Sequence, residues 1–224
     1  MLHATDGITW RHSPEAVGYP EALSSMEEQV GRILDGTGGE CVWLAEHPPL
    51  YTLGTSADQT EILETVKLPV YATGRGGRVT YHGPGQRIAY VMLDLRRRGR
   101  DVRAYVSGLE SWIIAVLKDF GVRGKTLAGR IGVWVQDASG QYAKIAAVGV
   151  RVRRGVTFHG VSLNVDPDLS HYEAIVPCGI RDADVTSLRR VGVDASMAEV
   201  DHALVRRFGE WVPPREPEAG TGSC

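Results

Sequence analysis

Cysteine is scarce in this sequence, with only Cys41, Cys178 and Cys224 among 224 residues. These three are too few and too scattered for a disulfide framework, and they lack the paired C-x2-C spacing typical of zinc sites. We therefore expect free thiols, and we predict no metal ion and no cofactor. Cys41 lies in an apolar segment typical of a buried core residue, whereas Cys224 ends a polar tail and is expected to be inert.

Long apolar runs are also absent. No segment approaches the roughly 18 residues of a membrane-spanning helix, and residues 1–15 lack the basic and then apolar layout of a secretion signal. We expect a cytoplasmic protein that does not enter a membrane. The formal net charge is only -2, from 25 Lys and Arg against 27 Asp and Glu, so the overall balance gives no reason to expect nucleic acid.

Positive charge is nevertheless concentrated in two short arginine runs. The first contains Arg96, Arg97, Arg98, Arg100 and Arg103, and the second contains Arg151, Arg153 and Arg154. Such runs are most often solvated surface. The functional alternative is a docking face for an acidic partner protein.

The composition is that of an ordinary globular protein, with 43% hydrophobic and 23% charged residues. The length suits one domain with a sizeable core, and neither an internal repeat nor an interdomain linker is visible. We predict a single domain over residues 1–212 that carries one active site. It includes a small helical element at 196–212, and a disordered tail follows at 213–224.

Hydrophobic periodicity predicts the secondary structure. Apolar residues at helical spacing indicate helices over 20–35 and 102–117, and the capping box Ser196-Met-Ala-Glu opens a third over 197–211. Short strands are predicted in a first group at 41–46, 50–54, 70–73, 78–82 and 87–95, and in a second at 131–137, 143–152 and 156–165. We therefore predict an α+β fold with a mixed, largely antiparallel sheet in two strand groups flanked by helices.

The densest cluster of polar and glycine residues is RGGRVTYHGPGQ, residues 75–86. Five glycines from Gly74 to Gly85 surround a strand, so that backbone can approach a ligand closely. Hairpins also use glycine for conformational reasons, and the segment matches neither a phosphate loop nor a G-x-G-x-x-G fingerprint. The pair Tyr81 and His82 beside Gly-Pro-Gly makes it a candidate binding site.

Cys178 is the candidate nucleophile. Proline before it and glycine after it hold the thiol on a turn with little steric cover. The alternative is a buried thiol that acts as a small hydrophobe. The reference pKa of a cysteine thiol is about 8.5, so the thiol is only slightly ionised at neutral pH. A nucleophilic cysteine therefore needs a cation or a base beside it.

The candidate partners for this thiol are His82, His159, His171 and Lys144. Lys144 lies in AKIAAVGV, among almost entirely apolar neighbours, where a lysine usually faces solvent or a sheet edge. If it faces inward, desolvation lowers its pKa, so that it can accept a proton while its charged form stabilises a thiolate. The residues alone leave Cys-His and Cys-Lys pairs equally open.

Four motifs in order resemble the bacterial-type lipoyl(octanoyl) transferases, within the biotin and lipoate protein ligase superfamily. They are RGGRVTYHGPGQRIAY, KIAAVGVRV, FHGVSLNV and PCGI, and the likeness runs from about Glu46 to about Leu188. The resemblance implies a biotin/lipoate protein ligase-like fold, an acylated Cys178, and Lys144 rather than histidine as its partner. It also implies a set of substrate-binding residues: Arg75, Gly76, Gly77, Arg78, Val79, Thr80, Tyr81, His82, Ala147, Val148, Gly149, Gly160, Val161 and Ser162.

Ser162 is a mild departure, because many members carry alanine there, and it predicts a slightly more polar acyl pocket. The implied activity moves an octanoyl or lipoyl group from an acyl carrier protein thioester to the lysine of a lipoyl domain, the first step of endogenous protein lipoylation. The donor would be octanoyl-acyl carrier protein. The acceptors would be lipoyl domains of 2-oxoacid dehydrogenase complexes and the glycine cleavage H protein.

Three alternatives remain open at this point. An ATP-dependent lipoate or biotin protein ligase shares the fold and a glycine-rich segment with a lysine, but needs no nucleophilic cysteine. A noncatalytic module would bind acyl carrier protein or lipoyl domains without reaction. A hydrolase would release free octanoate.

Overall fold

A computed structural model describes residues 7–63, 67–136, 140–175 and 184–212. Cys178, Cys224 and the tail predicted at 213–224 lie outside these residues. Cys41 lies within them, and it is buried in a strand as predicted. None of the helices in these ranges is both long and apolar enough to cross a bilayer.

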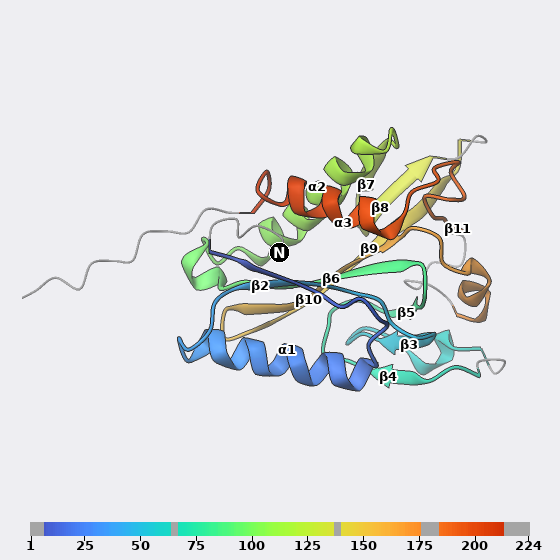
Figure 1. Cartoon of the computed structure of the whole chain (residues 1–224). Coiled ribbons are helices and arrows are strands. Elements are labelled where there is room, and N and C mark those ends of the chain that lie inside the picture. Colours follow the sequence, from blue (N-terminus) through green and yellow to red (C-terminus); the bar gives the residue numbers. More distant parts are fainter. Residues whose placement is uncertain (1–6, 64–66, 137–139, 176–183, 213–224) are drawn as a thin grey trace, which may run out of the picture.

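A large mixed sheet forms the centre of the molecule, with strand order β1-β2-β6-β10-β9-β8-β7 and β11 added beside β9 (Figure 1). Its strands are β1 Thr9–His12, β2 Cys41–Ala45, β6 Gln86–Met92, β7 Gly124–Leu127, β8 Arg130–Gln136, β9 Tyr142–Arg153, β10 Val156–Asn164 and β11 Asp184–Val185. Only β1 with β2 and β11 with β9 are parallel pairs. The predicted α+β fold with a mixed, largely antiparallel sheet is therefore confirmed.

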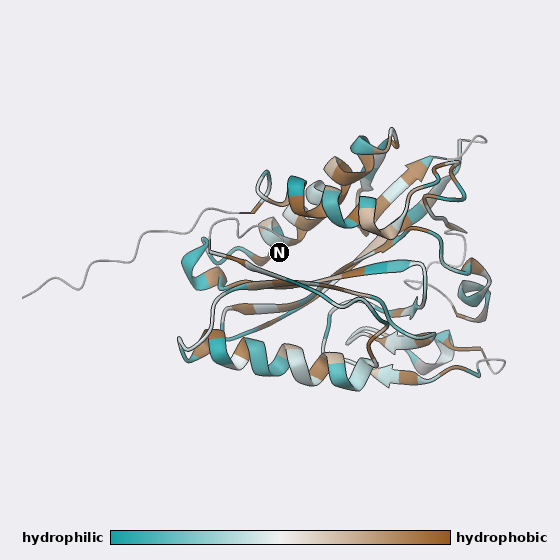
Figure 2. Ribbon diagram, in the orientation of Figure 1, coloured by the Kyte–Doolittle hydropathy of each residue, from teal (hydrophilic) through white to brown (hydrophobic). Residues whose placement is uncertain are grey.

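Helices cover both faces of this sheet. Helix α1, Tyr19–Leu34, lies on one face, while α2, Val102–Asp119, and α3, Met197–Phe208, lie on the other (Figure 1). Helix α1 shows brown and teal residues side by side along its length, as an amphipathic helix does (Figure 2). It buries Ala22, Met26, Val30 and Ile33 against the sheet, which is the spacing that predicted the helix.

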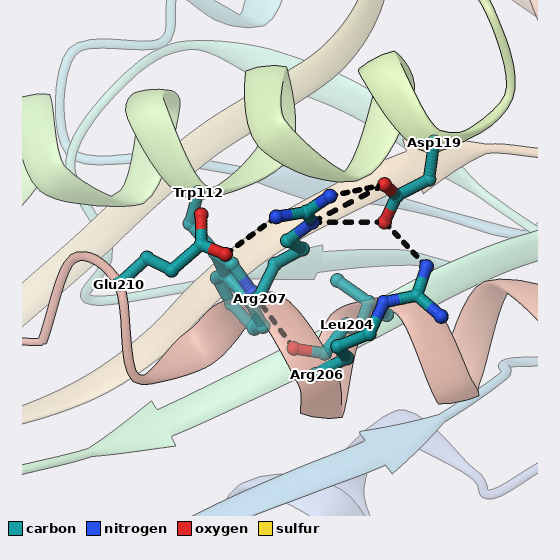
Figure 3. A network of polar contacts seen from close by, with 6 residues as sticks. All are labelled: Trp112, Asp119, Leu204, Arg206, Arg207 and Glu210. Atoms are coloured by element: carbon teal, nitrogen blue, oxygen red, sulfur yellow. Dashed lines mark hydrogen bonds and ion pairs between the residues drawn. The ribbon is translucent and has the colours of Figure 1, made fainter.

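The second face is held by aromatic packing and by ion pairs between α2 and α3. Trp112 of α2 packs on Phe208 of α3, and its indole N–H donates to the Leu204 carbonyl at 2.9 Å. Figure 3 shows the carboxylate of Asp119 between the guanidinium groups of Arg206 and Arg207. The capping box predicted at the start of α3 is present, although the helix ends at Phe208 rather than at residue 211.

A small three-stranded sheet lies beside the N-terminal end of α1 (Figure 1). It has the order β4-β3-β5, with β3 Leu50–Leu53, β4 Val70–Ala72 and β5 Val79–His82. The first predicted strand group is thus divided between two sheets, and β3 and β4 are parallel rather than antiparallel. Within the described residues there are also three short 3-10 helices: Gln59–Glu61, Leu95–Arg97 and Leu169–Ala174. The second of these replaces the end of the strand predicted over 87–95.

The arginine runs do not form one continuous surface. Arg98 is buried, and its guanidinium donates to both carboxylate oxygens of Glu40, at 2.9 and 2.6 Å. Both interpretations of the run, solvated surface and docking face, are therefore wrong for Arg98, because an ion pair this deeply buried is part of the core. Arg96 pairs with Asp94, whereas Arg100 and Arg103 are exposed.

Candidate functional site

A cavity of about 300 Å³ opens where β9 parts from β8. The two strands pair only between Gln136↔Tyr142 and Val133↔Ala146, while β9 continues beside β10 as far as Arg153. The cavity walls come from β6, β9 and β10, from the segment 75–80, from 129–131 and from α2. The cavity is therefore the space left between β8 and β9 beyond the point where they stop pairing.

A β-bulge decides which face of β9 reaches this cavity. Trp134 pairs with Lys144 and Val133 pairs with Ala146, so Ile145 is an extra residue on β9. Ile145 and Ala146 lie in the core under α2, whereas Lys144 and Ala147 both line the cavity. Regular alternation would place positions 144 and 147 on opposite faces, so the bulge is what brings the lysine into the site.

Lys144 is buried, and glycine at position 132 makes room for its side chain. Its Nζ lies 4.7 Å from the centre of the Trp134 ring. Gly132 has a φ of +119°, and a Cβ there would lie 2.6 Å from the Ala146 carbonyl oxygen and 3.3 Å from Lys144 Cε. No larger residue fits at position 132 without moving β9 or the lysine.

The chain returns to Lys144 shortly after the segment that contains Cys178. Val185 of β11 pairs with Lys144, and the Thr186 amide donates to the Lys144 carbonyl at 2.9 Å. Cys178 lies outside the described residues.

Arg75 fixes the glycine-rich segment as a wall of the cavity. Its Nη2 donates to the carbonyl and the hydroxyl of Thr52 at 2.9 and 2.7 Å, and to the Arg78 carbonyl at 3.0 Å. The Gly76 amide in turn donates to the Val150 carbonyl of β9 at 2.9 Å. The guanidinium of Arg75 therefore ties this loop to β3, and the loop backbone rests on β9.

Two glycines are paired across β9 and β10, and the one on β9 permits this close approach. Gly149 pairs with Gly160. A Cβ at Gly149 would lie 3.0 Å from Arg75 Cδ and 3.2 Å from the Gly76 carbonyl oxygen, and one at Gly160 would collide with the Ala89 carbonyl. The sheet floor is therefore bare at this point.

The inner end of the cavity is lined by Tyr19, His82, Tyr90 and His159, and His47 contacts Tyr90 from outside the lining. His47 Nδ1 lies 2.6 Å from the Val17 carbonyl, which can only accept, so Nδ1 carries the proton and Nε2 accepts from the Tyr90 hydroxyl at 2.5 Å. His82 Nδ1 lies 2.7 Å from the side-chain oxygen of Gln86. Burial, followed by the nearby His47 and Arg75, lowers the pKa of His82 to about 3, so this imidazole is neutral at physiological pH.

His159 has the most unusual backbone of the site. Its φ is +62° within β10, a left-handed conformation that costs a non-glycine residue roughly 1–3 kcal/mol. The imidazole stacks on Phe158, its neighbour in sequence, and its Nε2 lies 3.3 Å from the Tyr19 hydroxyl. Burial and then Arg75 lower the pKa of His159 to about 3. Within the described residues, Nδ1 has no hydrogen-bond partner.

Comparison with known proteins identifies the family. A family model described as the lipoyl protein ligase A/B catalytic domain matches residues 19–209. The chain belongs to this family. The lipoyl protein ligase A/B family is the one to which the four sequence motifs pointed, so the predicted resemblance is confirmed.

Individual relatives agree over nearly the whole chain. A protein named octanoyltransferase from Paramagnetospirillum magneticum is 57% identical over 203 residues, covering 91% of this chain and 96% of that protein. Another of the same name from Parvibaculum lavamentivorans is 58% identical over 202 residues, covering 89% and 90%. A bi-partite lipoate protein ligase from Thermoplasma acidophilum shares the fold, with a TM-score of 0.69 and 18% identity over 96% of this chain and 87% of that one.

The family resemblance implied a set of site residues. Every one of them that the structure describes lines the cavity, with the exception of Tyr81. Tyr81 is buried elsewhere, and its ring stacks on His171 with centroids 4.6 Å apart. Ser162 also lines the cavity, and the slightly more polar acyl pocket expected from it stays a prediction. No group of three or more His, Cys, Asp or Glu side chains in the described part of this family member is arranged to hold a metal ion.

Sequence reasoning missed several lining residues. They are Tyr19, Ile88, Tyr90, Val106, Gly129, Arg130, Ile131 and Val150, and His159 had been considered only as a thiol partner. Ile88 and Tyr90 alternate along β6 and lie directly across from Ser162 and Gly160. Alternate residues of a strand share one face, so the strand opposite the motif FHGVSLNV could have been searched for Ile88 and Tyr90. The sequence near Tyr19 carries no such signal.

Proposed function

We propose that this protein transfers an octanoyl group from the thioester of an acyl carrier protein to a lysine of a lipoyl domain. One observation carries the proposal: Lys144 lies buried in a cavity of a chain more than half identical to proteins named octanoyltransferase. A lysine in such a place can exchange protons with reacting groups that are shielded from water.

Cys178 is the proposed nucleophile, and Lys144 is its proposed proton partner. Cys178 lies six positions before Asp184, the first residue of β11, whose second residue pairs with Lys144. An extended chain of that length spans at most about 20 Å, so the length of the connection allows the thiol to come to the lysine. The two remaining cysteines are poorer candidates, because burial raises the pKa of Cys41 to about 11 and Cys224 lies in the Pro-, Glu- and Gly-rich segment 213–224, whose composition predicts disorder.

In the first half-reaction, the Cys178 thiolate attacks the thioester carbonyl and forms a tetrahedral intermediate. Its collapse breaks the bond to the carrier sulfur, which takes a proton from the Lys144 ammonium. The products are an octanoyl thioester on Cys178 and a free carrier thiol. Backbone N–H groups near Gly77 or Gly179 are candidate donors to the oxyanion.

In the second half-reaction, the acceptor lysine attacks the acyl-enzyme as a neutral amine. Lys144, now uncharged, takes the proton that the attacking nitrogen loses, and Cys178 leaves as thiolate. An amide replaces a thioester, which is downhill, so neither ATP nor a metal ion is needed. The Cys178 thiolate and the Lys144 ammonium, with which the cycle began, are thereby restored.

The cavity supplies the place for the acyl chain. Gly149 and Gly160 leave the sheet floor bare, and Ala147, Val148 and Val161 add apolar wall. An eight-carbon chain laid along β9 would bury its methylenes there, each worth about 0.8 kcal/mol.

Exposed arginines suit the proposed acidic partners. Arg103 lies one helical turn before Val106, which lines the cavity, and Arg153 and Arg154 are exposed at the end of β9. Positive charge on the surface of the enzyme speeds encounter with an acidic protein, and this effect weakens with salt. We expect kcat/KM for the carrier to fall with ionic strength, and to fall further in Arg103→Glu. A salt-independent kcat/KM would remove these arginines from the docking face.

Intact-mass measurement after mixing with octanoyl carrier protein, without ATP, tests the proposal. The wild type should gain one octanoyl group, and addition of a lipoyl domain should move that mass to the domain. Cys178→Ser should gain none, whereas the matched control Cys41→Ala should still be acylated. Lys144→Arg keeps the charge but cannot act as a base, so its transfer rate should fall at least ~100-fold.

Other outcomes would identify other functions. A requirement for ATP and free octanoic acid, with an active Cys178→Ser variant, would indicate a ligase. Stable binding of the carrier without any adduct would indicate a binding module. Release of free octanoate in the presence of a lipoyl domain would indicate a hydrolase.

A further inference from the structure

The acyl cavity has one exposed end and one buried end. Ile131, in the segment where β8 leaves β9, is 58% exposed, whereas Tyr19 and His159 at the opposite end are each 3% exposed. A substrate therefore enters beside Ile131 and Lys144, and its chain points toward Tyr19. The residues at the buried end are the ones that a growing acyl chain meets last.

Strand register gives the distance between the reacting groups and this end. The end of the Lys144 side chain lies next to Gly132. Val133 is paired with Ala146, so Gly132, one residue earlier on β8, lies near Ala147, one residue later on β9. His159 pairs with Val150, three residues further along β9, or about 10 Å at 3.3 Å per residue. An extended octanoyl chain has seven C–C bonds of about 1.5 Å and spans about 9 Å.

We propose that Tyr19 and His159 together form the end wall of the acyl cavity and set the upper limit of acyl chain length near eight carbons. This inference rests on the proposed function, because it assigns the chain-length specificity of the same site. It makes Tyr19 a specificity-determining residue contributed by α1, outside the four family motifs.

The wall is held in place from several sides. Tyr19 is the first residue of α1, and its ring packs on His47 and on Tyr71 of β4, with centroids 5.8 and 5.4 Å away. His159 contacts the Tyr19 hydroxyl and stacks on Phe158. A longer chain could advance only by separating Tyr19 from His159 and leaving both polar groups buried beside a methyl group.

A chain-length series on the carrier protein tests the proposal. Transfer of six-, eight-, ten- and twelve-carbon acyl groups to a lipoyl domain is measured for the wild type and for Tyr19→Ala, Tyr19→Phe and Tyr142→Ala. In Tyr19→Ala, the ratio of kcat/KM for twelve carbons to that for eight should rise at least ~10-fold, because removal of the ring opens room for the extra methylenes. Tyr19→Phe keeps the ring and should keep the wild-type ratio, within about threefold. Tyr142→Ala removes a half-buried tyrosine outside the cavity and is the matched control.

His159→Asn is the second variant, to be used if Tyr19→Ala fails to fold. Asparagine tolerates a positive φ, and its shorter side chain should raise the same ratio. An unchanged ratio in a folded variant that still transfers octanoyl would overturn the end wall. A rise in Tyr19→Phe equal to that in Tyr19→Ala would overturn its steric basis. Failure of the wild type to transfer any acyl group would instead refute the proposed function.

Discussion

Replacing Gly132 with alanine should destabilise the protein and displace Lys144 at the same time. The new Cβ would lie 2.6 Å from the Ala146 carbonyl oxygen, closer than real Cβ atoms come to backbone, and 3.3 Å from Lys144 Cε. Strand β8 would have to move away from β9 at the bulge. The Gly132 amide, which donates to Glu110 at 2.7 Å, would move with it.

Two terms set the size of the effect. A non-glycine residue at φ +119° costs roughly 1–3 kcal/mol, and crowding against backbone that cannot easily yield adds about 1–3 kcal/mol. Gly121 after α2 provides the matched control, with a φ of +73° and nothing within 4 Å of its added Cβ. Gly121→Ala should therefore cost only about 1–2 kcal/mol, from conformation alone.

Thermal unfolding and octanoyl transfer are the two assays. A difference of about 2–3 kcal/mol between the two variants corresponds to a gap of about 4–12 °C in Tm for a chain of this size. Transfer by Gly132→Ala, measured well below its Tm, should fall at least ~10-fold, because Lys144, the proposed proton partner, loses alignment when it is displaced by a few tenths of an ångström. If both variants melt within about 2 °C of each other, position 132 is not crowded, and the account of the bulge is wrong.

Three further predictions concern stability. Arg207 and Arg206 lower the pKa of Asp119 to about 2, so the ion pair stabilises the fold above pH ~4 and is lost as pH falls through about 2. Asp119→Asn should thus cost about 1 kcal/mol at pH 7 and much less near pH 2 by urea unfolding, and an equal cost at both pH values would refute this account of the ion pair. The pKa of His159 is lowered to about 3, so between pH 6.5 and 3 only the unfolded state takes its proton, and stability falls as pH falls. Urea unfolding should show a slope about 1.4 kcal/mol per pH unit shallower in His159→Asn, and an unchanged slope would mean that this imidazole is charged when folded. Thr157 donates to the Val91 carbonyl at 2.8 Å and accepts from the Leu93 amide at 2.9 Å, so Thr157→Val should lower the free energy of unfolding by about 2 kcal/mol, whereas a neutral result would mean that these groups find other partners.

Features that depend on neighbours in sequence were predictable. The burial of Ala22, Met26 and Val30 follows from a period that any isolated helix would show. The capping box of Ser196 and Glu199 is contained within four residues. Both were read correctly because the interactions that create them are local.

Features that depend on distant partners were missed. Strands β1, β7 and β11 are two to four residues long, too short to show a period, and each exists because a longer strand offers it a partner. Arg98 was read as part of a charged run because Glu40, its buried partner, lies far away in sequence. Tyr19 reaches the cavity only because α1 packs against the sheet. No pattern near position 19 indicates that this side chain lines a cavity.

The extra residue at Ile145 limits how this protein can change. Lys144 and Ala147 lie three positions apart, yet they share a face only because one residue between them is taken out of the alternation. An insertion or deletion at this point would turn either Lys144 or Ala147 away from the cavity, even if every motif residue were retained. A descendant that keeps the role proposed for Lys144 must therefore keep the length of this segment as well as its chemistry, and a change of length there would mark a protein that has lost this role while keeping the fold.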